Sequence, residues 1–183
     1  MTHYVAFLRA INVGGHVVKM DHLRQLLEQL GFSQVETCIA SGNVIFESTS
    51  RSAKALERRI GIHLHKELGY EVATFIRTIS EVAEIARYKP FQESDLNAAG
   101  VTTYVGFLAE TLDAAAQAAV MSFRTKVDDF HVHQREIYWL CRIRSSDSEF
   151  SLARLEKALG VQATFRNSTT VTKIADQYAT RKK

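Results

Sequence analysis

The stretch YVAFL at residues 4–8 returns almost unchanged as YVGFL at residues 104–108. Further matches follow in the same order, because a Leu-Gly pair at 68–69, and again at 159–160, is followed each time by Ala-Thr-Phe. Self-similarity of this kind indicates one structural unit used twice. The 183 residues are enough for two small units that share the chain.

The first unit contains four strand-like and two helix-like segments. Apolar and alternating runs predict the strands, and leucines and isoleucines at helical spacing predict the helices, which glycines end. The predicted segments are a strand at 3–12, a helix over 20–30, strands at 35–40 and 44–47, a helix over 53–68 and a strand at 72–76. This order, β-α-β-β-α-β, is typical of the ferredoxin-like fold.

The second unit is predicted to repeat this order. Its segments are a strand at 102–109, a helix over 112–124, a hairpin at 129–142, a helix over 149–159 and a strand at 161–166. Each unit is followed by an extra helix, with Thr78 and Glu81 as a capping box for the first and Ser168 as the cap of the second. We therefore predict an α/β fold of the α+β type with two ferredoxin-like units, at 1–88 and 101–183, joined by a linker at 89–100.

The first strand is apolar on both of its faces. Tyr4, Ala6 and Leu8 point to one face, and Val5 and Phe7 point to the other. A strand buried on both sides needs cover on both sides, whereas an isolated ferredoxin-like unit leaves one sheet face open. We expect the second unit or a partner chain, such as a second copy in a homodimer, to provide this cover.

Composition and charge argue against several classes of protein. The formal net charge is +3, and Arg181, Lys182 and Lys183 supply three positive charges, so the rest of the chain sums to zero. A neutral body argues against a dedicated nucleic-acid-binding protein. The two cysteines form no CxxC pair, and the N-terminus does not resemble a signal peptide. Because no apolar run reaches the roughly 20 residues that span a bilayer, we expect a cytoplasmic protein without a membrane segment.

Candidate ligand-binding residues gather where the first strand passes into the first helix. In this topology that loop, the helix N-terminus and the turn between the second and third strands share one end of the unit. Helix N-termini and glycine backbone bind anions, so a small anionic or phosphorylated ligand fits this end. The candidates are Asn12, Gly14, Gly15, Lys19, Ser41, Gly42 and Asn43. The alternative is structural, with the glycines in a tight turn and Asn43 closing a hairpin.

The second unit lacks these loop residues. Ala109–Asp113 stands in place of the Gly-Gly loop, and His133–Glu136 stands in place of the Ser-Gly-Asn turn. The scaffold residues of the two units match while these loops differ. The fold alone therefore does not require the glycines, which favours a functional interpretation.

Two arginines and the start of the last helix supply further candidates. Arg9 and Arg166 end largely apolar strands, where a guanidinium group needs a carboxylate, a carbonyl or a ligand. A structural salt bridge is the alternative for both. Asn167, Thr170 and Lys173 lie in the first turns of the predicted last helix, either as a second anion site or as simple capping residues.

The sequence identifies no reaction, and whether the protein is an enzyme stays open. His131, His133 and Cys141 do not complete a zinc pattern, and no nucleophile motif is present. We expect no metal and no cofactor.

Binding of nucleic acid has little support in the sequence. The third strand carries one aromatic residue and lacks the RNP pattern of RNA-recognition domains. Arg51, Lys54 and Arg58 share one helix face, which we interpret as a solvated surface. Weak binding of single-stranded nucleic acid through this face is the alternative.

Four motifs occur in order along the chain. They are FLRAINVGG at 7–15, VKM at 18–20, SGNVIF at 41–46 and TFRNSTTV at 164–171. Together they resemble a bacterial family known as domain of unknown function 1697. Ala10 stands where that family usually has glycine, and Ser168 stands where an aromatic residue usually follows Arg-Asn. The resemblance implies a fold of ferredoxin-like repeats and no established activity.

Three hypotheses for function follow. The first is binding of a small anionic or phosphorylated ligand at the Gly14-Gly15 loop and the Ser41-Gly42-Asn43 turn. The second is a non-catalytic protein-interaction or oligomerisation module, whose apolar sheet faces pair with a partner or a second copy. The third is weak binding of single-stranded nucleic acid.

Overall fold

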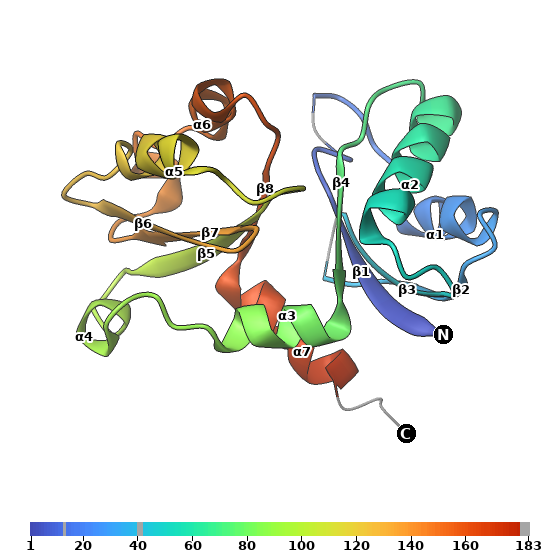
Figure 1. Ribbon diagram of the computed structural model, residues 1–183, viewed down its shortest axis with the longest axis horizontal. Helices are drawn as coiled ribbons and strands as arrows, with labels where there is room; N and C mark the ends of the chain where they lie inside the picture. The colour runs from blue at the N-terminus through green and yellow to red at the C-terminus, as the bar shows by residue number, and fades with distance from the viewer. Residues whose placement is uncertain (13, 40–41, 180–183) are drawn as a thin grey trace. The chain divides into compact units, whose positions relative to one another are not determined.

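The computed structural model describes residues 1–12, 14–39 and 42–179. The chain forms two compact units, which we call unit 1 and unit 2. Unit 1 holds residues 1–83 together with the C-terminal residues from Ile174 on, and unit 2 holds Glu84–Lys173. The chain leaves unit 1 within helix α3 (Ile79–Arg87) and returns to it within helix α7 (Ser168–Ala179) (Figure 1).

Unit 1 has the predicted β-α-β-β-α-β order. Its elements are β1 (Thr2–Leu8), α1 (Met20–Glu28), β2 (Ser33–Thr37), β3 (Asn43–Ser48), α2 (Ala53–Leu68) and β4 (Thr74–Thr78). The strands lie in the order β2-β3-β1-β4, and each neighbouring pair is antiparallel. β3 is therefore inserted between β1 and β2, which is the ferredoxin-like arrangement.

Helices α1 and α2 cover one face of the unit 1 sheet (Figure 1). Tyr4, Ala6 and Leu8 of β1 belong to this core, where they join buried leucines and isoleucines of both helices. Val5 and Phe7, on the other face of β1, are also fully buried. The strand is therefore buried on both faces, as its apolar sequence predicts.

The C-terminal part of α7 belongs to unit 1 and lies against β2. The Tyr178 hydroxyl donates a hydrogen bond to the Glu36 carboxylate at 2.7 Å. Glu36 pairs with Ile45 of β3, whose neighbours Val44 and Phe46 face the helix-covered core. Tyr178 therefore reaches the sheet face opposite α1 and α2.

Unit 2 repeats the fold. Its elements are α4 (Glu93–Leu96), β5 (Thr102–Phe107), α5 (Ala114–Met121), β6 (Asp128–His133), β7 (Glu136–Cys141), the short 3-10 helix η1 (Ser145–Asp147), α6 (Leu152–Leu159) and β8 (Thr164–Asn167). The strand order is β6-β7-β5-β8, and α5 and α6 cover one face of the sheet (Figure 1). The predicted α+β fold with two ferredoxin-like units and an extra helix after each is confirmed. Helix α4 is an addition, since that segment was expected to be a linker.

The strand register corrects the alignment of the two repeats by one residue. The matching Ala-Thr-Phe segments at 73–75 and 163–165 suggest a residue-by-residue equivalence. In the sheets, Arg77 pairs with Val5 of β1, and Arg166 pairs with the equivalent valine of β5. Arg77 and Arg166 are therefore equivalent residues, although the sequence match places them one position apart.

Side chains at the ends of β4 and β8 begin the two extra helices. Thr78 Oγ1 accepts a hydrogen bond from the Glu81 N–H at 3.1 Å, and the Glu81 carboxylate accepts one from the Thr78 N–H at 2.7 Å. The predicted capping box is therefore confirmed. Before α7, Asn167 Oδ1 accepts from the N–H of Thr169 at 2.9 Å. The prediction that Ser168 caps this helix was wrong, because α7 already begins at Ser168 and the preceding asparagine supplies the cap.

Among the residues that the structure describes, no helix is both long enough and apolar enough to cross a bilayer.

Candidate functional site

The β2–β3 turn lies beside the end of β1 in unit 1. The backbone N–H of Leu8 donates to the carbonyl of Gly42 at 2.7 Å, and Asn43 pairs with Phe7 in the β1–β3 ladder. The fold thus brings this turn next to the start of the β1–α1 loop. Ser41, the remaining candidate in the turn, lies outside the described residues.

Both ends of the β1–α1 loop are fixed by hydrogen bonds. Asn12 Oδ1 accepts from the N–H of Val18 at 2.7 Å and so closes the loop. The hydroxyl of Tyr70 donates to the carbonyl of buried Ile11 at 2.9 Å, and the Tyr70 ring stacks on His16 with centroids 3.8 Å apart. The side chain of Asn12 therefore has a structural role in shaping the loop.

Gly14 and Gly15 lie exposed at the tip of this loop. Their φ angles are +69° and +88°, in the left-handed region that glycine adopts without steric penalty. No atom lies within 4 Å of a Cβ added at either residue. Backbone conformation, and not crowding, therefore requires glycine here. Arg9, at the start of the loop, is half-buried and its N–H donates to the carbonyl of Ala73 at 2.8 Å.

Asn43 closes the hairpin from the inside. Its side-chain amide donates to the carbonyls of Cys38 at 3.2 Å and Ile39 at 3.3 Å, and the residue is buried. These bonds correspond to the structural alternative that the sequence left open for Asn43. The residue can hold the turn in place for a ligand without touching it.

The N-terminus of α1 differs from those of α2, α5 and α6. Serine or aspartate side chains cap α2, α5 and α6 through Ser52, Asp113 and Ser151. The cap position of α1 is the exposed Lys19, whose side chain makes no capping hydrogen bond. A lysine beside the positive end of a helix dipole is unfavourable. Asp21 lies in this turn but is directed to Arg24, at 4.0 Å.

The second set of candidates begins with Arg166 in unit 2. The Nη1 atom of this half-buried arginine donates to Thr164 Oγ1 at 2.8 Å and to the carbonyl of Phe165 at 2.9 Å. Burial lowers the pKa of Arg166 from 12.5 to about 10. Asn167 caps α7, Thr170 follows in the first turn of that helix, and Lys173 lies exposed in the next.

Sequence reasoning missed Arg77, the equivalent of Arg166. Arg77 is 1% exposed and is the largest fully buried side chain among the described residues. Its Nη1 donates to the carbonyl of Ile76 at 2.8 Å. The available signal is positional, because each arginine directly precedes a residue that caps the next helix, Thr78 or Asn167.

Comparison with known proteins identifies a family of unknown function and a similar solved structure. Residues 1–138 match a family described as "Protein of unknown function (DUF1697)". A similar solved structure is that of the conserved bacterial protein SP0830 from Streptococcus pneumoniae, at 26% sequence identity and a TM-score of 0.78. The match covers 98% of this chain and 99% of that chain. No curated protein matches.

Proposed function

This chain belongs to the DUF1697 family of proteins of unknown function, as its motifs predict, and we propose a function from the geometry of unit 1. We propose that unit 1 binds a small anionic or phosphorylated ligand at the N-terminus of α1. The ligand contacts the backbone of the Gly14-Gly15 loop and the ammonium group of Lys19.

The observation that carries this proposal is the difference between the equivalent helix starts of the two units. In unit 2, Asp113 places a carboxylate at the N-terminus of α5, where its Oδ1 accepts from the N–H of Ala116 at 2.8 Å. In unit 1, the cap position of α1 is Lys19, without a side-chain cap. One copy of the repeat thus supplies its own anion at this place, whereas the other has a cation there. An external anion satisfies the unit 1 helix in the way that Asp113 satisfies its counterpart.

The neighbouring residues fit distinct roles in this site. The exposed glycines allow an anion to approach the backbone closely, and Lys19 adds an exposed positive charge. Asn12 and Asn43 position the loop and the turn through their own hydrogen bonds. Arg9 stands at the start of the loop, and Ser41 and Gly42 stand in the adjacent turn. The second set, Arg166, Asn167, Thr170 and Lys173, stays a prediction of the sequence and has no part in this proposal.

A charge substitution at the cap tests the proposal. Lys19→Asp gives α1 the kind of cap that α5 has, so we expect the ligand-free protein to become more stable by about 1 kcal/mol. The same carboxylate repels an anion, so stabilisation by inorganic phosphate is lost. For the wild-type protein, phosphate at ten times its Kd raises the free energy of unfolding by about 1.4 kcal/mol. Thermal melting in phosphate, against sodium chloride of equal ionic strength, measures both effects.

Lys126→Asp in unit 2 is the matched control, because Lys126 is exposed and its substitution changes the net charge by the same amount as Lys19→Asp. This variant should keep the full response to phosphate. Amide chemical shifts locate the site, and the N–H signals of Gly14, Gly15 and Met20–His22 should move on titration. Retention of the phosphate response in Lys19→Asp, or shift changes elsewhere in the chain only, would contradict the proposal.

A further inference from the structure

A groove runs along the outer surface of α2. None of the residues that line it belongs to the β1–α1 loop. It has a volume of about 790 Å³ and lies between α2 and Leu30, which follows α1. The groove lies wholly within unit 1. Its residues have no role in the anion site proposed above.

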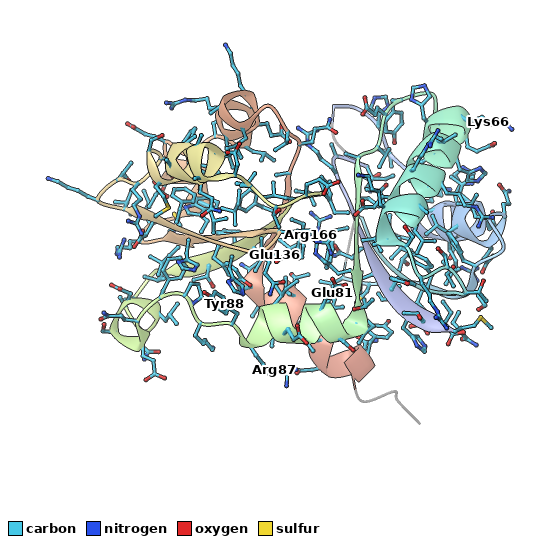
Figure 2. The ribbon with its side chains drawn as sticks, in the orientation of Figure 1. Lys66, Glu81, Arg87, Tyr88, Glu136 and Arg166 are labelled. Atoms are coloured by element: carbon cyan, nitrogen blue, oxygen red, sulfur yellow. The ribbon has the colours of Figure 1, made fainter. Side chains whose placement is uncertain are left out.

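Three of the positive side chains of the groove follow one stripe of the helix. Lys54, Arg58, Ile62 and Lys66 are four residues apart and therefore share a face. Lys66 projects from the end of this helix (Figure 2). Ile62, in the middle of the stripe, is 60% exposed. The surface thus presents an apolar side chain with a cation one helical turn to either side, about 6 Å away along the axis.

No carboxylate lines this groove among the described residues. Glu57 lies on the sheet side of α2, where its Oε1 accepts from the N–H of Ile76 at 2.8 Å. Glu67 lies next to Lys66, and its carboxylate is 3.8 Å from the Lys66 ammonium group. The groove therefore keeps an excess of positive charge.

Arg59 holds one wall of the groove in a fixed position. Its Nη2 donates to the carbonyl of Leu30 at 2.6 Å, and its guanidinium carbon lies 5.4 Å from the centre of the Phe32 ring. Fixing this side chain in the free protein lowers the entropic cost of binding. The Nε2 atom of His63, another lining residue, is buried without a hydrogen-bond partner in the part of the chain that the structure describes. A polar group brought in by an occupant can relieve this cost.

We propose that this groove binds an acidic amphipathic helix of a partner protein. A helix with a leucine or similar side chain against Ile62, and carboxylates one turn before and after it, matches the apolar centre and the flanking Arg58 and Lys66. Helix-in-groove recognition uses this spacing of anchors. No Phe, Tyr or Trp side chain lines the groove within the described residues, so bases of a single-stranded nucleic acid have no ring on which to stack. A concave surface whose one large exposed apolar side chain, among the described residues, is Ile62 also fits a helix better than a flat bilayer.

A peptide titration with charge reversal tests this proposal. The probe is a fluorescein-labelled synthetic helix of leucine, alanine and glutamate with one apolar stripe flanked by glutamates, followed by fluorescence anisotropy. Arg58→Glu combined with Lys66→Glu should weaken its binding by about tenfold or more. Lys126→Glu combined with Lys157→Glu changes the net charge equally in unit 2 and should leave binding within about twofold. A probe with lysine in place of glutamate should bind the reversed groove better than it binds the wild-type protein.

Further measurements test whether the binding depends on the helical pattern of the peptide and on this groove. A scrambled peptide of equal composition should bind about tenfold more weakly, because its leucines no longer form one stripe. Lys19→Asp should leave peptide binding unchanged, which separates this groove from the phosphate site. Equal binding of the scrambled peptide, equal loss in the unit 2 control, or tighter binding of oligo(dT) or anionic phospholipid vesicles at the same residues would overturn the proposal. Circular dichroism melts establish that each variant is folded.

Discussion

Gly106 and Phe165 face each other across β5 and β8. A Cβ added at Gly106 would lie 2.5 Å from Cζ of Phe165, so the aromatic ring fills the space of the missing side chain. In unit 1 the equivalent pair is Ala6 with Ile76, both fully buried. Each unit therefore combines one small and one large residue at this place in the sheet.

We expect Gly106→Ala to lower the free energy of unfolding by about 1–3 kcal/mol, because the added methyl group forces the Phe165 ring out of its packed position. Urea denaturation measures the loss. The double variant Gly106→Ala with Phe165→Ile copies the unit 1 pair and should recover part of it. If the double variant is less stable than Gly106→Ala alone, the two residues are not coupled in this way.

The ionisation of His131 is tied to its packing in unit 2. Its Nε2 lies 2.9 Å from the Tyr88 hydroxyl. Burial is the main cause that lowers the pKa of His131 below 6.5, and His133 and Arg124 lower it further against the opposing charge of Asp129. Between the lowered pKa and 6.5, the unfolded chain therefore binds more protons than the folded chain. Stability contributed by neutral His131 is present at neutral pH and is lost as the pH falls through this window.

The wild-type protein should therefore lose stability as the pH falls from neutral through about 6.5 and below, and His131→Gln should reduce this loss. Guanidinium denaturation over this range measures the free energy of unfolding at each pH. His22→Gln serves as the control, because His22 is exposed on α1 and the variant should follow the wild-type curve. Parallel curves for His131→Gln and the wild-type protein would count against the assignment.

At the scale of elements, the N-termini of α1 and α2 differ. A side chain caps α2, whereas we assign the N-terminus of α1 to a ligand. Ser52 Oγ accepts from the N–H of Ala55 at 3.2 Å at the start of α2, whereas Lys19 makes no such bond for α1. The two helices pack on the same sheet. The two cap positions therefore form a matched pair within one unit.

Ser52→Ala should lower the free energy of unfolding by about 1 kcal/mol, because α2 loses its side-chain cap. Lys19→Ala should change it by less than about 0.5 kcal/mol, since no cap bond is removed. Urea denaturation of the two variants in phosphate-free buffer gives the comparison. Losses of equal size would show that Lys19 stabilises α1 in a way that the hydrogen bonds do not reveal.

At the scale of the whole molecule, the two units share a topology and differ in the pairing at one edge of the sheet. β6 pairs with β7 through six consecutive residue pairs, from Asp128 to His133. The pairing of β2 with β3 changes register between Ser33 and Glu36, and Gln34 has a φ of +50°. The edge strand β2 of unit 1 is therefore less regularly bonded to its neighbour than the edge strand β6 of unit 2.

Hydrogen exchange followed by mass spectrometry should reveal this difference. Amides of the central strands β1, β3, β5 and β7, which have a strand on both sides, should exchange slowest in their units. Amides of β2 should exchange faster than those of β6, because fewer regular ladder bonds protect them. Equal or slower exchange in β2 would contradict this assignment.

The candidate site was predicted in part. The topology alone places the β2–β3 turn beside the end of β1, and the Leu8 to Gly42 hydrogen bond shows this neighbourhood. The sequence could not show that the side chains of Asn12 and Asn43 form hydrogen bonds with the backbone of the loop and of the hairpin. Such bonds depend on where a backbone N–H or carbonyl lies after folding, and residue type does not specify that position.

The sequence by itself determined the repeated ferredoxin-like units and the capping box of Thr78 and Glu81. Hydrophobic periodicity and short-range side-chain bonds, which act between residues close in the chain, are enough for both. Only the tertiary structure decided the equivalence of Arg77 with Arg166. Strand register is set by packing and hydrogen bonds between distant segments, and a shift of one residue changes which side chain faces the core.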